Sequence, residues 1–137
     1  MSTPKNRCDD RGLAIRLKEY LEQFDLAVGY YSKRFDEVFL NTRLAKYGLP
    51  AMRLQRHKDI YFVMKTHFSL QSNSLKNVAI FLFGKTLKTD LSLDLWRLAH
   101  AGDPEAYEAV VEHCVFDVKE LARVWDRVKS VAGDLKK

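Results

Sequence analysis

A short apolar run between helix-periodic segments constrains the fold of this chain more than any other feature. The run DLAVGYY, residues 25–31, is too brief for a helix and is typical of a buried strand. Ahead of it, apolar residues at near-helical spacing predict an amphipathic helix over residues 9–24, with Asp9 or Asp10 as its N-cap. The chain therefore begins with a helix followed by a strand, which indicates a fold that contains both kinds of element.

Helical segments account for most of the remaining sequence. Residues 36–47 have a helical apolar pattern that Gly48 ends, and a second short strand is expected at residues 56–61. The tripeptide Gly102-Asp103-Pro104 ends one helix, caps the next and supplies its first residue. Further helices are expected at residues 61–68, 75–84, 91–101 and 104–131, which gives about six helices and a small sheet of one or two strands.

Composition narrows the class of protein. A length of 137 residues with 47% hydrophobic residues suits one globular domain. Trp96 and Trp125 fall at helical core spacing, so both are expected to pack in a core. No apolar run approaches the roughly 20 residues that cross a bilayer, and the N-terminus lacks the pattern of a signal peptide, so we expect a cytoplasmic protein with no membrane contact. Cys8 and Cys114 show no metal-binding or disulfide spacing.

The formal charge of +5 is compatible with a polyanionic partner. Many domains without such a partner carry a similar charge, so composition alone does not decide for nucleic acid.

Three collinear stretches carry a family resemblance. They are VGYYSKRFDEVFLNTRLAKYGLP at residues 28–50, HFSLQSNSLKNVAIFLFG at residues 67–84, and LDLWRLAHAGDPEAYEAVVEHCVFDVKELARVWDRV at residues 93–128. Together, in this order and at these separations, they resemble the DEDD-type 3′-to-5′ exonucleases, which have an RNase H-like fold. The resemblance implies a single α/β domain of RNase H-like type over residues 1–137.

The resemblance also implies a chemistry and two metal ligands. In these exonucleases four carboxylates hold two divalent metals, usually Mg²⁺ or Mn²⁺; one metal activates water and the other stabilises the leaving oxygen. Asp36 matches the aspartate of the second motif, and Asp117 matches that of the third. From the residues alone, Asp36 equally suits a helix N-cap and Asp117 a solvated helix position.

Two further residues have open roles. His113 lies four residues before Asp117, hence on the same helical face, where a tyrosine-type exonuclease has the Tyr that orients the attacking water. His113 is therefore a candidate catalytic residue, as a general base or water-positioning group, or else a structural residue. Asp59 is a candidate for a supporting role behind the metal ligands, or simply a strand-end residue.

Residues flanking Asp36 are candidates for nucleic-acid contact. Tyr31, Lys33 and Arg34 combine an aromatic face with two phosphate-seeking cations, although solvated loop residues have the same composition. Tyr31 also departs from the family, which commonly has Asn after the preceding tyrosine.

The first motif of the family, Asp-x-Glu on an opening strand, is not found in this sequence. We therefore expect a truncated domain that lacks its N-terminal strands and half of its metal ligands, and that binds Mg²⁺ or Mn²⁺ weakly. The strand at residues 25–31 would then have an exposed edge, which predicts a homodimer or a partner chain that covers it.

Two functions follow from these features. The first is a metal-dependent 3′-to-5′ exonuclease-like domain that acts on DNA or RNA ends and is incomplete alone. The alternative is a non-catalytic nucleic-acid-binding or protein-interaction domain.

Overall fold

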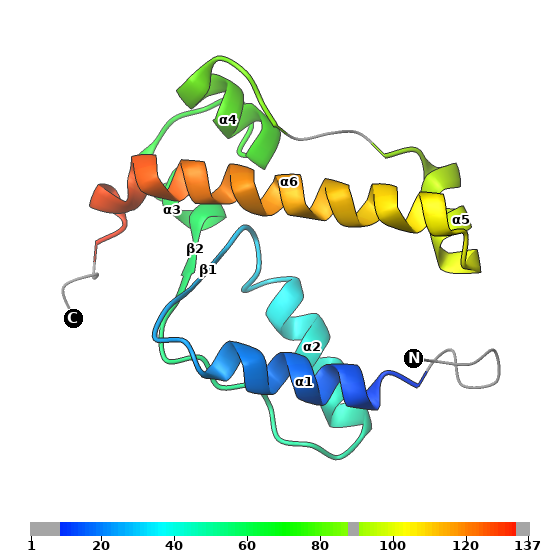
Figure 1. Ribbon diagram of the computed structural model, residues 1–137. Helices are drawn as coiled ribbons and strands as arrows, with labels where there is room; N and C mark the ends of the chain where they lie inside the picture. The colour runs from blue at the N-terminus through cyan, green and yellow to red at the C-terminus, as the bar shows by residue number, and fades with distance from the viewer. Residues whose placement is uncertain (1–8, 88–90, 134–137) are drawn as a thin grey trace. The chain divides into compact units, whose positions relative to one another are not determined.

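The computed structural model describes residues 9–87 and 91–133, and its contacts divide the chain into two compact units with the boundary between Phe62 and Val63. The described residues form six helices and two strands, as the sequence predicts. In chain order they are α1 (Arg11–Glu22), β1 (Ala27–Gly29), α2 (Asp36–Lys46), β2 (His57–Asp59), α3 (Ile60–His67), α4 (Leu75–Phe83), α5 (Leu93–Ala101), α6 (Pro104–Val128) and the short 3-10 helix η2 (Lys129–Val131) (Figure 1).

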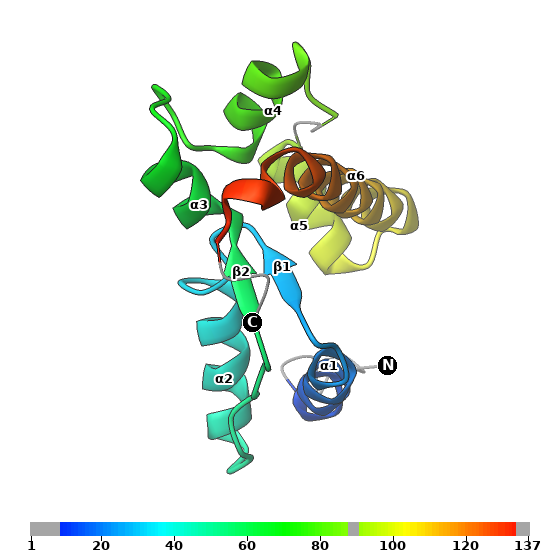
Figure 2. The ribbon, with the colours of Figure 1, turned by 90° about the vertical axis from the view of Figure 1, so that its left-hand side faces the viewer.

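The first unit contains a two-stranded parallel sheet. β1 pairs with β2 in the register Ala27 to His57 and Gly29 to Asp59, and α2 provides the crossover that a parallel pair requires (Figure 2). Because the strands are parallel, the loop after Gly29 and the start of α3 after Asp59 lie at the same edge of the sheet. This edge carries most of the candidate residues.

An apolar cluster joins the two helices of the first unit. Ala14 of α1, Leu40 and Leu44 of α2 and Met52 form its buried centre, and Leu44 is fully buried. Leu40 and Leu44 follow the helical periodicity that predicts α2, whereas Met52 comes from the segment after this helix.

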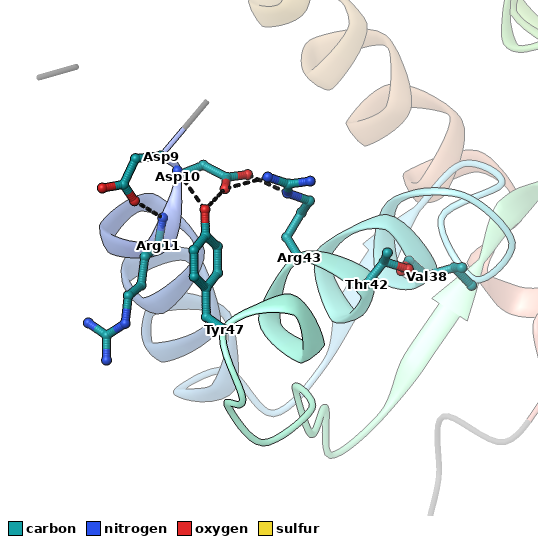
Figure 3. A network of polar contacts seen from close by, with 7 residues as sticks. All are labelled: Asp9, Asp10, Arg11, Val38, Thr42, Arg43 and Tyr47. Atoms are coloured by element: carbon teal, nitrogen blue, oxygen red, sulfur yellow. Dashed lines mark hydrogen bonds and ion pairs between the residues drawn. The ribbon is translucent and has the colours of Figure 1, made fainter. Parts of the chain in front are cut away.

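The N-terminus of α1 differs in detail from the prediction. Asp10 occupies the N-cap position, but its side chain makes no capping hydrogen bond. Its carboxylate instead accepts hydrogen bonds from Arg43 Nε at 2.7 Å and from the Tyr47 hydroxyl at 2.7 Å, both on the α2 side (Figure 3). The neighbouring Asp9 accepts a hydrogen bond from Arg11 N at 3.3 Å. Asp9 therefore makes the local contact at the start of α1, and Asp10 makes the tertiary contact to α2.

Side-chain caps set the helix ends of the second unit. Ser74 accepts a hydrogen bond from Asn77 N at the start of α4, and Asp103 accepts one from Ala106 N at the start of α6. Gly102 ends α5 with a φ of +102°, a conformation that glycine adopts at little cost. The roles of Gly102 and Asp103 were predicted from the sequence.

Three expectations for the second unit need correction. Trp96 was expected in a core, but 45% of it is exposed, on a helix that has no buried residue. α5 begins at Leu93 rather than Leu91, because Ser92 caps it. Residues 129–131 form a 3-10 turn after α6 instead of its last turn.

Cys114 is an exposed free thiol, whereas Cys8 lies outside the described residues.

Candidate functional site

Asp59 organises the site at the carboxyl ends of the two strands. The residue is only 3% exposed, and its Oδ1 accepts hydrogen bonds from Tyr31 N at 2.6 Å and Tyr61 N at 3.1 Å. Its Oδ2 accepts a hydrogen bond from Lys33 N at 3.0 Å. Both carboxylate oxygens are therefore engaged by backbone N–H groups, and Asp59 holds the β1–α2 loop against the end of β2. This geometry fits both roles weighed for Asp59, since it is the last residue of β2 and also holds the loop that leads to Asp36.

The backbone of Tyr31 is left-handed, with a φ of +60°. This region is costly for a bulky residue such as tyrosine and is better tolerated by Asn. Hydrogen bonding of Tyr31 N to Asp59 offsets part of the cost.

An exposed aromatic surface lies beside the same loop. The Tyr31 ring meets Tyr61 edge-on at 4.8 Å and stacks with Phe62 at 6.0 Å, while 45% of Tyr31 remains exposed. The Arg34 guanidinium lies 5.8 Å from the centre of the Phe62 ring. Tyr31 and Arg34, both nominated for nucleic-acid contact, therefore share one surface with Phe62, and Lys33 is an exposed neighbour.

A Ser-His-Glu contact underlies this loop. Ser32 Oγ lies 2.7 Å from His57 Nε2, and His57 Nδ1 lies 3.5 Å from Glu37 Oε2. Ser32 is buried, so the contact fixes the loop to β2 and to α2 rather than presenting a nucleophile. Gly29 is required here, because a Cβ at this position would collide with the Ser32 side chain.

Sequence reasoning missed the Ser32, His57 and Glu37 contact. The three residues lie in separate segments and match no motif that spacing could reveal.

Asp36 lies in the first turn of α2, and Phe35 rather than Asp36 occupies the N-cap position. Asp36 as a whole residue is exposed, but desolvation of its carboxyl group raises its pKa above the usual value. The negative charge of Asp59 raises this pKa further, and His57 opposes the shift. The carboxylate thus lies where its own charge is disfavoured. Such a position is typical of a functional carboxylate, and structural carboxylates share it less often.

A groove of about 470 Å³ runs between α1 and α2, with Asp36 among its lining residues. Most of the lining is apolar, from Leu13, Leu17, Phe35 and Phe39. Phe35 and Phe39 are also among the exposed large hydrophobic residues.

The second unit contains the other pair of candidates. His113 Nε2 lies 3.5 Å from Asp117 Oδ2 on α6, with side-chain exposures of 13% and 31%. The expected shared helical face is therefore present. The catalytic role of His113 and the ligand role of Asp117 stay predictions.

The described residues do not form a complete metal site by themselves. Within residues 9–87 and 91–133 no group of three or more His, Cys, Asp or Glu side chains is arranged to hold a metal ion. Asp59 does not fill the gap beside Asp36, since its oxygens are engaged by backbone donors.

Comparison with known proteins supplies the family. Residues 4–129 match the model of a family described as the RNase_H superfamily. The chain belongs to the RNase H superfamily. No curated protein matches it significantly. This membership supports a nuclease-like domain and suggests nucleic acid as its partner. Nucleases of this superfamily usually use divalent metals.

The elements of the structure agree with this family. Six helices and a small parallel sheet among the described residues are consistent with the mostly helical α/β fold expected from the sequence. Among the described residues, no helix is both long and apolar enough to cross a membrane.

Proposed function

We propose that this protein is a 3′-to-5′ exonuclease-type module acting on DNA or RNA ends, in which further carboxylates must come from another polypeptide segment. The position of Asp36 carries the proposal. It follows the loop at the carboxyl end of a parallel strand pair, where ligands of open α/β sheets bind, and its surroundings raise its pKa. The superfamily match over residues 4–129 supports the same class of activity.

Each candidate residue has one role in this proposal. Asp36 and Asp117 are carboxylate ligands for Mg²⁺ or Mn²⁺, and His113 orients or deprotonates the attacking water. Asp59 supports the site by holding the loop that precedes Asp36. Tyr31, Lys33 and Arg34 contact the nucleic acid through stacking and phosphate contacts.

The sheet supports the need for a partner. Within the described residues it has two parallel strands, whereas parallel sheets are ordinarily larger and covered on both faces. β1 therefore has an edge to which no described strand is hydrogen bonded. We propose that a second copy of the chain or a partner chain adds strands there and brings the remaining carboxylates.

The second candidate function is a nucleic-acid-binding domain without catalysis. It is favoured by the lack of a three-ligand cluster among residues 9–87 and 91–133. In this case the aromatic and cationic surface around Tyr31 would bind single strands without hydrolysing them.

Incubation of the purified chain with end-labelled single-stranded DNA and RNA, with Mn²⁺ and with EDTA, tests the proposal. The module alone should bind the strands and leave them intact, and a supplied polypeptide carrying an Asp-x-Glu strand should induce Mn²⁺-dependent shortening from the 3′ end. Asp36→Asn and Asp117→Asn should each abolish that shortening.

Two exposed aspartates are matched controls. Asp94, with 85% of its side chain exposed, lies in the first turn of α5 as Asp36 does in α2, and Asp126 shares α6 with Asp117. Asp94→Asn and Asp126→Asn should leave the shortening unchanged. Shortening that survives Asp36→Asn would refute the assignment, and binding that never leads to shortening would favour the second function.

A further inference from the structure

Two guanidinium groups of α6 share one aromatic ring of α4. The Arg123 Cζ atom lies 4.2 Å from the centre of the Phe83 ring, and the Arg127 Cζ atom lies 4.7 Å from it. The two arginines are four residues apart and so lie on one helical face. In Figure 1, α4 lies alongside the part of α6 that carries them. Like charges gathered in this way repel each other unless an anion is near.

Glu120 neutralises Arg123 and holds the segment after α4. It is fully buried, and its Oε2 accepts hydrogen bonds from Arg123 Nη2 at 2.6 Å and Nε at 3.1 Å. Its Oε1 accepts one from Thr86 Oγ1 at 2.6 Å and one from Leu87 N at 2.7 Å. With these four hydrogen bonds the carboxylate of Glu120 is saturated, so it does not serve Arg127.

Most of the guanidinium N–H donors of Arg127 remain accessible to solvent. It is exposed, and its guanidinium donates one hydrogen bond, of 3.3 Å, to the carbonyl oxygen of Leu82. Across residues 9–87 and 91–133 it forms no ion pair with a carboxylate. The Phe83 ring orients the guanidinium, so less side-chain entropy is lost when it binds an anion.

Lys85 adds a third cation to the same end of α4. It is exposed and lies between Gly84, which ends α4 in a left-handed conformation, and Thr86, which is bonded to Glu120. Its backbone is thus held in place from both sides. This region therefore carries three positive charges, from Lys85, Arg123 and Arg127, and one negative charge, from Glu120.

We infer that this cationic cluster, defined as Phe83, Lys85, Arg123 and Arg127, binds the phosphate backbone of a nucleic-acid strand. Guanidinium groups match phosphate geometry, and a preorganised excess of positive charge suits a polyanion. The cluster belongs to the second unit, whereas the surface around Tyr31 belongs to the first. The inference rests on the proposed nucleic-acid partner but requires no catalysis.

Fluorescence anisotropy with labelled single-stranded DNA and RNA, in EDTA and over a series of salt concentrations, tests the cluster. Arg127→Gln and Lys85→Gln should each weaken binding equally for all base sequences. Each should also reduce the slope of log affinity against log salt by about 0.7, the value for one phosphate contact on a single strand. Arg97→Gln is the control, because Arg97 is an exposed arginine of the same unit, on α5.

Several results would overturn the cluster. These are an unchanged affinity and salt slope in the Arg127→Gln/Lys85→Gln double variant, an equal loss in Arg97→Gln, and binding of inorganic phosphate without binding of either strand. Equal thermal midpoints of variant and parent chains show that a loss of affinity does not come from unfolding. Because EDTA excludes metal-dependent hydrolysis, a failed exonuclease assay leaves this result intact.

Discussion

At the residue scale, Asp36 lies where its negative charge is disfavoured. Its pKa is raised in the folded chain, so the folded state holds its proton more tightly than the unfolded state does. Its favourable contribution to the free energy of unfolding is complete below the ordinary pKa of 3.8 and is lost as the pH rises through the raised pKa. At neutral pH the charged carboxylate is a cost to the fold.

Asp36→Asn should therefore increase the free energy of unfolding at neutral pH, and the gain should shrink as the pH falls below the raised pKa. Urea unfolding at several pH values measures it. The matched variant Asp94→Asn removes a first-turn charge from α5 without relieving such a cost, so it should leave stability equal or slightly lower. A loss of stability in Asp36→Asn as large as that in Asp94→Asn would contradict the expectation.

Asp10 has the opposite pH dependence. Hydrogen bonds from Arg43 and Tyr47 hold the pKa of its carboxyl well below the usual 3.8 (Figure 3). Its contribution to stability is thus present above pH 3.8 and is lost as the pH falls below that value toward the folded-state pKa.

Asp10→Asn should lower the thermal midpoint at neutral pH, and the difference from the parent chain should close in acid. The neighbouring Asp9→Asn is the control, because Asp9 makes one hydrogen bond, of 3.3 Å, within its own turn. Circular dichroism melts at neutral and acid pH measure both. An Asp9→Asn effect equal to that of Asp10→Asn would show that capping, rather than the contact to α2, dominates.

At the element scale, the close approach of β1 to the loop that follows it sets a strict requirement for glycine. A Cβ at Gly29 would overlap the Ser32 side chain, which is itself held by His57. Overpacking of this kind costs about 1–3 kcal/mol.

Gly29→Ala should therefore destabilise the chain by about 1–3 kcal/mol, and adding Ser32→Gly should recover part of that loss. Gly12→Ala in α1 is the control, because only the flexible end of Arg16 lies near its added methyl group. In a helix this change should stabilise by roughly 0.5–1 kcal/mol. Chemical unfolding of the four proteins decides between packing and a general effect of Gly-to-Ala substitution.

The elements themselves were largely predictable, because their boundaries depend on local signals. Ser74, Asp103 and Gly102 cap or end helices through contacts within a few residues, which the sequence displays directly. The misplaced details depend on distant partners. Asp10 bonds to α2 instead of its own helix, and Ser32 meets His57 across 25 positions, which no local pattern encodes.

The candidate site was predictable in part for the same reason. The sequence identified Asp36, Asp59 and the Tyr31 loop through a resemblance, and the structure adds that Asp59 bonds to the backbone of Tyr31 and Lys33. The cationic cluster was missed because Arg123 and Arg127 look like ordinary solvated residues of a long helix until Phe83 and Glu120 are placed beside them.

At the scale of the whole molecule, exposed apolar surface is abundant. Leu13, Phe35 and Phe39 in the first unit and Leu93 and Val118 in the second are each more than half exposed. Exposed apolar side chains in such number favour association with another chain.

The purified chain should therefore self-associate as its concentration rises, unless a partner chain is supplied. Sedimentation velocity over a concentration series measures this. Phe39→Ser, which removes a 59% exposed ring from the groove between α1 and α2, should weaken the association. If the chain stays monomeric at every concentration and no partner chain copurifies with it, the proposal that another chain pairs with the edge of β1 is contradicted.

The binding of Mn²⁺ to the isolated chain, followed by the electron paramagnetic resonance signal of the free ion, tests the central claim most directly. Asp36 and Asp117 as the available carboxylates predict weak binding, which Asp36→Asn and Asp117→Asn each reduce and which Asp94→Asn and Asp126→Asn leave unchanged. Binding that is equal in all five proteins would contradict the assignment of Asp36 and Asp117 as the metal ligands.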